Sequence, residues 1–145
     1  MNGLRTVRHN LDGTITITDT RTLDEAQEEA RNRLALHFDT IVAAGRNYQG
    51  KNFQIDGASL QNINGASSMA MIAQANAAPY SQGWIASDNS VVTFDAAGMI
   101  AFGVDVGAYY SALVLNNRAL KDAIAALADN AACDSFDVTQ GWPSN

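Results

Sequence analysis

The sequence predicts an α+β fold: long amphipathic helices with small antiparallel β-hairpins between them, preceded by an N-terminal β-hairpin arm. Three observations indicate this class. Apolar residues recur at helical spacing in long stretches, short runs of β-branched or aromatic residues flank turn residues, and no linker rich in proline, serine or charge divides the chain. We therefore expect a docking arm over residues 1–21, followed by one α+β domain over residues 22–145.

The hairpin of the arm is expected over residues 4–19. Asp12-Gly13 predicts its turn, because glycine adopts a positive φ without steric cost. In the second strand threonine and isoleucine alternate, which places Ile15 and Ile17 on the same face. Because an isolated two-stranded hairpin is only marginally stable in water, the arm should pack on its own domain or pair with a partner.

The first long helix is expected over residues 23–44. Thr22 and Glu25 match the capping box, in which the two side chains satisfy free backbone N–H groups at the start of a helix. Gly45 is a suitable stop signal, since helices often end on a glycine in the left-handed conformation. The buried face of this helix is predicted to consist of Ala26, Ala30, Leu34, Phe38, Ile41 and Val42.

A short hairpin and a second helix are expected next. The hairpin is predicted over residues 48–55, with its turn at Gly50-Lys51. The helix is predicted from about residue 59 to about residue 77, and Pro79 ends it. Its buried side is predicted to consist of Leu60, Ile63, Met69 and Ile72.

A third hairpin leads into the longest helix. Residues 84–86 and 91–94 flank a polar turn, which is typical of a hairpin. Asp95 is then expected to cap an apolar helix over residues 96–127, because aspartate is a preferred N-cap residue. The tail, residues 134–145, is expected to be extended.

The final helix carries the most apolar part of the chain, residues 96–115. It contains Asp105 and is flanked by polar turns, so we interpret it as a buried helix and not as a membrane span. Asp105 should either reach water or pair with an arginine, in this chain or across a subunit interface. Gly103 and Gly107 lie one turn apart on one face, where a second backbone can approach closely. This pattern is equally consistent with packing inside the chain and with contact between subunits.

Composition excludes several classes of function. The net charge is −6 and the basic residues form no run, so nucleic acid is not an expected partner. Charged residues make up 17% of the chain, below the usual share of about 25%, which favours a surface partly covered by a partner. Cys133 is the only cysteine, so no intrachain disulfide forms, and residues 1–10 lack the apolar core of a signal peptide.

No catalytic or metal-binding motif is present in the sequence. Residues 45–52 have the spacing of a phosphate-binding loop, but Asn52 replaces the required hydroxyl residue, and the segment follows a helix where such a loop should open one. We interpret it as a helix end followed by a hairpin turn. His9, His37 and Cys133 do not have the spacing of a zinc site. The chain is therefore predicted to be a non-enzymatic protein without a metal or cofactor.

Several stretches after Thr22 occur in a distinctive order. A long first helix is followed by a short hairpin with aromatic residues and by a second hairpin with a polar turn. An acidic helix cap, a basic helical segment and a C-terminal segment with a tryptophan come after them. These stretches are Tyr48-Gln49-Gly50-Lys51-Asn52-Phe53, residues 84–92, residues 95–99, residues 118–124 and Gly141-Trp142-Pro143.

In this order and spacing the chain resembles an uncharacterised C-terminal domain family of bacteriophage tail and tail-fibre-associated proteins. The resemblance covers roughly four-fifths of the chain, from residue 22 onward. It implies a structural component of the virion, at the tail tip, the baseplate or the fibre attachment, made in the cytoplasm of the bacterial host. The expected partners are other phage tail proteins and further copies of the chain, with a homotrimer favoured and no insertion into a membrane.

The resemblance also places the expected contacts. The arm, through Ile15 and Ile17, would dock on a neighbouring protein by strand addition. The apolar helix would form the three-fold interface. A tail-fibre assembly chaperone that is absent from the finished particle is the main alternative, and a small cell-wall hydrolase is a third possibility. The predicted interface residues are Ile15, Ile17, Phe102, Gly103, Val106, Gly107, Tyr110 and Trp142.

Overall fold

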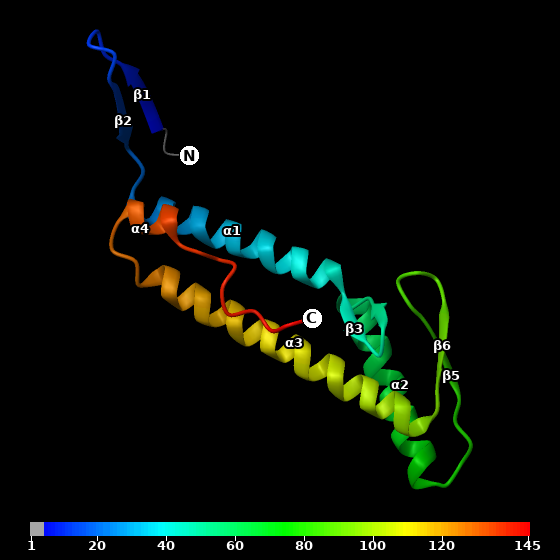
Figure 1. Cartoon of the computed structure of the whole chain (residues 1–145). Coiled ribbons are helices and arrows are strands. Elements are labelled where there is room, and N and C mark those ends of the chain that lie inside the picture. Colours follow the sequence, from blue (N-terminus) through cyan, green and yellow to red (C-terminus); the bar gives the residue numbers. More distant parts are fainter. Residues whose placement is uncertain (1–4) are drawn as a thin grey trace. The chain divides into compact units, whose positions relative to one another are not determined.

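The computed structural model describes residues 5–145 and has the predicted α+β fold (Figure 1). Helices and two-stranded antiparallel sheets follow one another along the chain. Two compact units are present. The first combines residues up to His37 with Asn117–Gln140, and the second combines Phe38–Asn116 with Gly141–Asn145. The boundary predicted between residues 21 and 22 falls inside the first unit, and Leu4 lies outside the described residues.

The arm is the antiparallel pair β1 (Arg5–His9) and β2 (Ile15–Asp19). Gly13 has φ +82° in the turn, as the Asp12-Gly13 dipeptide predicted. Asp12 fixes this turn by accepting a hydrogen bond from the Thr14 backbone N at 3.0 Å. All ten residues of the two strands are exposed, so the hairpin has no apolar cover of its own in the described structure.

Helix α1 (Leu23–Ala44) begins and ends at the predicted residues. Its capping box forms: the Thr22 N donates to Glu25 Oε2 at 2.7 Å, and the Glu25 N donates to Thr22 Oγ1 at 3.2 Å. In the first unit, Gln27 of α1 donates to the carbonyl oxygen of Leu127 at 3.1 Å. The buried apolar side chains of this unit are Ala26, Ala30, Leu34, Leu120, Ile124 and Cys133.

Arg21 is the one charged residue among the buried residues of the described chain, with a side chain 1% exposed. Its guanidinium donates to Asp19 at 2.6 Å, to Asp134 at 3.0 Å and to Glu29. Three carboxylates thus surround one buried cation. The hydrogen bonds from Arg21 hold the pKa of the Asp19 and Asp134 carboxyls below their usual range. The cluster joins the end of the arm to the start of α1 and to Asp134.

Helix α4 (Asn130–Ser135) was not predicted. The expectation that the chain is extended from residue 134 is therefore wrong for Asp134 and Ser135. Asp129 caps α4 by accepting a hydrogen bond from the Ala132 N at 2.8 Å. A helix of six residues is too short to show an apolar period, so the cap residue was its only signal in the sequence.

After the end of α1, the second unit contains two hairpins, one whole helix and most of another. The 48–55 hairpin is observed with its turn at Gln49-Gly50, one residue earlier than predicted. The second helix starts and ends two residues before its predicted limits. The elements are β3 (Arg46–Tyr48), β4 (Lys51–Phe53), α2 (Gly57–Ala75), β5 (Gln82–Ile85), β6 (Val91–Phe94) and α3 (Ala96–Ala125).

Aromatic rings form the centre of the core of the second unit. The Phe102 ring of α3 lies 4.7 Å from the ring of Phe53 and 5.1 Å from that of Phe94, measured between centroids. Asp95 caps α3 as predicted, because the Gly98 N donates to its carboxylate at 2.7 Å. The side chains that α3 contributes to this core are Met99, Phe102, Val106, Tyr109 and Leu113.

Helix α3, interpreted from the sequence as a buried helix, is buried on one face only. Val104 and Leu115, on its other face, are 67% and 68% exposed. Among residues 5–145, α3 is the only helix long and apolar enough to cross a membrane by length and composition. Of its most apolar window, 28% is buried in the protein.

The buried face of α2 differs from the prediction. Ile63 is buried and Leu60 packs against the core as predicted, but Met69 and Ile72 are 59% and 55% exposed. On the buried side of α2, the small residues Ser67 and Ala70 stand where large side chains were expected. These small residues let α2 lie close to α3, where Ser67 Oγ donates to the Met99 carbonyl oxygen at 3.3 Å. Large side chains do not fit into such a close helix contact, so they point outward.

Candidate functional site

The residues considered for chemistry are dispersed. His9 lies on β1, His37 on α1, and Cys133 is fully buried in α4. Among residues 5–145, no three His, Cys, Asp or Glu side chains are grouped so that they could hold a metal ion. The segment resembling a phosphate-binding loop ends α1 at Gly45 and continues into the β3–β4 hairpin, as interpreted from the sequence.

Asp105 is paired inside the chain. Arg46 of β3 donates to both of its carboxylate oxygens, at 2.8 and 3.0 Å. The guanidinium also lies 4.5 Å from the centroid of the Tyr109 ring and donates to the Ser144 carbonyl oxygen at 3.1 Å. The hydrogen bond from Arg46 to Asp105 raises the pKa of Arg46 further above its usual value. These contacts of Arg46 fix β3 and the C-terminal segment on α3.

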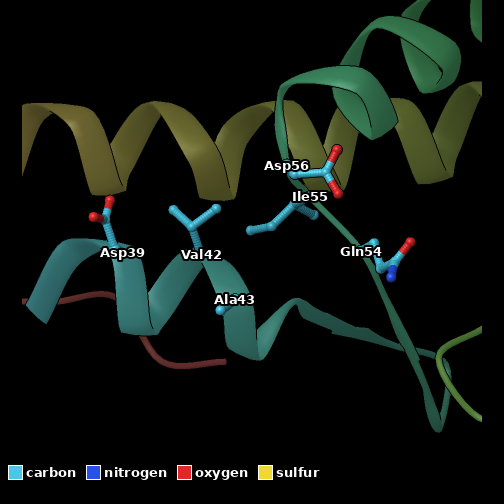
Figure 2. Close-up of a pocket in the computed structure, with 6 residues that line it drawn as sticks. All are labelled: Asp39, Val42, Ala43, Gln54, Ile55 and Asp56. Carbon is cyan, nitrogen blue, oxygen red and sulfur yellow. The ribbon is translucent and has the colours of Figure 1, made fainter. Parts of the chain in front are cut away.

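A cavity of about 370 Å³ lies between the end of α1 and the segment that joins β4 to α2 (Figure 2). Val42 and Ile55 contribute apolar walls, and Asp39 and Asp56 contribute one carboxylate from each side. The Asp56 carboxylate caps α2, accepting from the Ser59 N at 2.8 Å, and this bond lowers the pKa of Asp56. The Asp56 carboxylate therefore serves as the N-cap of α2.

A larger groove of about 660 Å³ runs between α2 and β5 and is called the α2–β5 groove here. From α2 it takes residues three or four positions apart, which lie on one helical face. From β5 it takes all four residues of the strand. Its lining consists of Gln54, Ser59, Asn62, Ala66, Met69, Tyr80, Gln82, Gly83, Trp84 and Ile85.

The α2–β5 groove is electrically neutral. No lining residue is charged, and residues 57–87 contain no Asp, Glu, Lys or Arg. Basic residues are missing over a longer range, because none occurs between Lys51 and Arg118. Large apolar side chains are exposed here as well, including Met69 at 59% and Ile85 at 66%. Depletion of charge together with exposed apolar side chains is typical of a surface that contacts another protein.

The predicted interface residues fall into separate classes. Ile15 and Ile17 are 58% and 64% exposed on the arm, where a partner can reach them. Tyr110 and Trp142 are partly buried, and both rings pack on Phe38 of α1 within the second unit, at centroid distances of 6.4 and 6.0 Å.

Phe102 and Val106 require a correction. They are 0% and 1% exposed and belong to the core of the second unit. They were assigned to an interface because the resemblance implies that the apolar helix forms the three-fold contact. The structure shows that these two positions lie on the face that packs against the chain itself.

Gly103 and Gly107 have different environments. A Cβ atom at Gly103 would lie 2.1 Å from Ser67 Oγ and 3.0 Å from Ser67 Cβ, so this glycine serves the contact of α3 with α2. A Cβ atom at Gly107 would have no neighbouring atom within 4 Å. Of the two alternatives left open for this pair, packing inside the chain applies to Gly103, and Gly107 faces open space.

Alanine substitutions should separate the two glycines. We expect Gly103→Ala to lower the free energy of unfolding by about 1–3 kcal/mol, because it overpacks a close helix contact. Gly107→Ala should raise it by up to about 1 kcal/mol, because alanine favours the helix and meets nothing. Urea denaturation of both variants measures this. Equal effects at the two positions would show that α2 and α3 do not approach each other as described.

The α2–β5 groove was not predicted from the sequence. Trp84 was identified only as part of the predicted hairpin, and Tyr80, Gln82 and Gly83 were not singled out. Two signals were available. One is the absence of charge over residues 57–87, and the other is a glycine inside a strand, which often marks the close approach of another backbone.

A family model described as "Domain of unknown function (DUF4376)" matches residues 25–139. The matched range includes the α2–β5 groove and leaves out the arm. No curated protein and no solved structure matches the chain.

Proposed function

Because the chain belongs to this family of domains of unknown function, its role has to be inferred from its own residues, and we propose that it is a structural component of a bacteriophage tail that acts through protein–protein contacts. Its place would be the tail tip, the baseplate or the fibre attachment. It would work as a homotrimer with other tail proteins as neighbours and without catalysis.

The neutral, apolar surface around α2 is the observation that carries the protein-contact part of this proposal. Soluble monomers normally cover their surface with charged residues, yet residues 57–87 have none. Met69, Met71 and Ile72 expose more than half of their area on α2. Contact with another protein removes such apolar area from water, which is favourable by about 25 cal/mol per Å².

The bacteriophage part of the proposal is supported by the order of motifs in the sequence. The Tyr48–Phe53 hairpin, the residue 84–92 hairpin and the closing Gly141-Trp142-Pro143 occur in the order of the tail-protein domain that the chain resembles. The first two motifs are adjacent in the structure, where Lys51 and Asp88 form an ion pair at 2.7 Å. These motifs therefore act together as part of one fold.

Mass spectrometry of purified phage particles tests the proposed function. We expect the protein in the particles at a fixed copy number that is a multiple of three, counted against a known tail protein of the same particles. Lysate of infected cells is the matched control. Presence in the lysate with absence from the particles would reject the structural role and favour the assembly chaperone.

A further inference from the structure

We propose that the arm of one copy of this chain adds as a third strand to β5 of a second copy, inside the α2–β5 groove. The inference rests on the proposed self-assembly and names the contact that would produce it. It follows from backbone groups that pair with no other strand at two strand edges, that of β5 in the groove and that of β2 in the arm.

The outer edge of β5 carries backbone groups that pair with no other strand in the described structure. Within residues 5–145, β5 pairs only with β6, in a two-stranded sheet. At the turn the Ala86 N donates to the Ser90 carbonyl oxygen at 2.9 Å, and this bond sets which residue pairs of the ladder are hydrogen-bonded. Because such pairs alternate in an antiparallel ladder, Gly83 and Ile85 direct their N–H and C=O groups away from β6.

This free edge faces the α2–β5 groove. All four residues of β5 line the groove, and no residue of β6 does. The Gln82 side chain donates to the Gly83 carbonyl oxygen at 3.0 Å, so a flexible amide occupies an acceptor that an incoming strand could use. Gly83 itself has no side chain to hold another backbone at a distance.

The arm presents a matching edge. The Asn10 N donates to the Thr14 carbonyl oxygen at 2.9 Å, and Val7 lies opposite Ile17 in the register. By the same alternation, Ile15 and Ile17 direct their backbone N–H and C=O groups outward from β2. Each edge therefore has two residues, separated by one position, whose backbone N–H and C=O groups point outward. The pairing of two strands requires this spacing on both sides.

Both surfaces favour being covered, and neither brings charge into the contact. Every residue of the arm's two strands is exposed, and a two-stranded hairpin alone is marginally stable in water. The run from Thr14 to Thr18 is uncharged and β-branched, and the groove is neutral. Burying this run against β5 therefore leaves no unpaired charge.

A second copy supplies the arm without the need for another protein. The contact uses different surfaces on the two copies, so it is head-to-tail. Head-to-tail contacts form closed rings when the rotation between subunits closes, and three copies related in this way would give the proposed trimer.

Proline substitutions at the edges test the inference. Ile17→Pro removes an outward N–H from β2, whereas Val7→Pro removes one from the opposite edge of the same residue pair. Proline is tolerated at strand edges where the N–H faces outward, so both variants should keep the hairpin. Sedimentation velocity of the full chain should show that Ile17→Pro weakens self-association at least tenfold, about 1.4 kcal/mol, and that Val7→Pro leaves it unchanged.

The groove side has an equivalent pair of variants. Ile85→Pro removes an outward N–H from β5, and Val91→Pro removes one from the outer edge of β6. We expect Ile85→Pro to weaken association as much as Ile17→Pro, and Val91→Pro to have no effect. Circular dichroism checks that each variant keeps its helices. If a proline variant loses its helices, Gln82→Ala is tested in its place. This substitution removes the side chain that occupies the Gly83 carbonyl oxygen, so it should strengthen association.

Two results would overturn the inference. One is a wild-type chain that stays monomeric at about 100 µM, a concentration at which even a contact of micromolar affinity would be formed. The other is association that responds equally to both members of a proline pair. Either result can occur while the protein is found in phage particles, so failure of this contact is distinct from failure of the proposed function.

Discussion

Phe102→Ala is expected to lower the free energy of unfolding by about 3–5 kcal/mol, among the largest effects of a single substitution in this chain. The Phe102 side chain is fully buried, and its ring contacts those of Phe53, Phe94, Tyr48 and Trp84 at centroid distances between 4.7 and 6.1 Å. Removing it leaves a cavity that rings attached to different elements cannot close. Chemical denaturation followed by circular dichroism measures the loss.

Val104→Ala is the matched control on the same helix. Val104 is 67% exposed, so its truncation should change the free energy of unfolding by less than about 0.5 kcal/mol. The comparison also separates the core assignment of Phe102 from the interface assignment made from the sequence. An interface residue would change the concentration dependence of association and leave the stability of the monomer near that of the wild type.

Gly45→Ala should be the second severe substitution, with an expected loss of about 2–4 kcal/mol. Gly45 has φ +75°, which an alanine adopts only at a cost of about 1–2 kcal/mol. A Cβ atom would also lie 2.5 Å from the backbone oxygen of Phe53 and 2.7 Å from Asn52 Oδ1. The backbone oxygen belongs to β4 and cannot move without disturbing the hairpin.

Gly50→Ala isolates the conformational part of that loss. Gly50 has φ +78° in the β3–β4 turn, but no atom lies within 4 Å of the position of its Cβ. Its substitution should therefore cost only the strain of the left-handed conformation, about 1–2 kcal/mol. Thermal denaturation of both variants at one pH is sufficient, and equal losses would contradict the close approach of β4 to the end of α1.

Local signals allowed much of the fold to be predicted. Helix α1 was delimited correctly because a capping box and a glycine stop mark its two ends. The arm followed from Asp12-Gly13 and the alternating strand after it. The β5–β6 hairpin followed from its polar turn. In each case the decisive interaction joins residues a few positions apart, which a single sequence displays directly.

Features that depend on distant residues were not predicted. The buried face of α2 depends on Gly103 of α3, which leaves room for Ser67, while Met69 lies on the exposed side. The same holds for the candidate site. Ile15 and Ile17 were identified because strand alternation is local. The α2–β5 groove was missed because it forms only when α2 and β5 lie beside each other.

The absence of basic residues between Lys51 and Arg118 has a practical consequence for protein chemistry. Trypsin cleaves only after lysine and arginine, so it releases residues 52–118 as one long peptide that standard peptide sequencing detects poorly. A count of copies in phage particles should therefore use the shorter peptides 22–31 and 34–46, which cover most of α1. Chymotrypsin cleaves after aromatic residues, so in place of trypsin it divides the central region, with Trp84, Phe94 and Phe102, into peptides short enough to sequence.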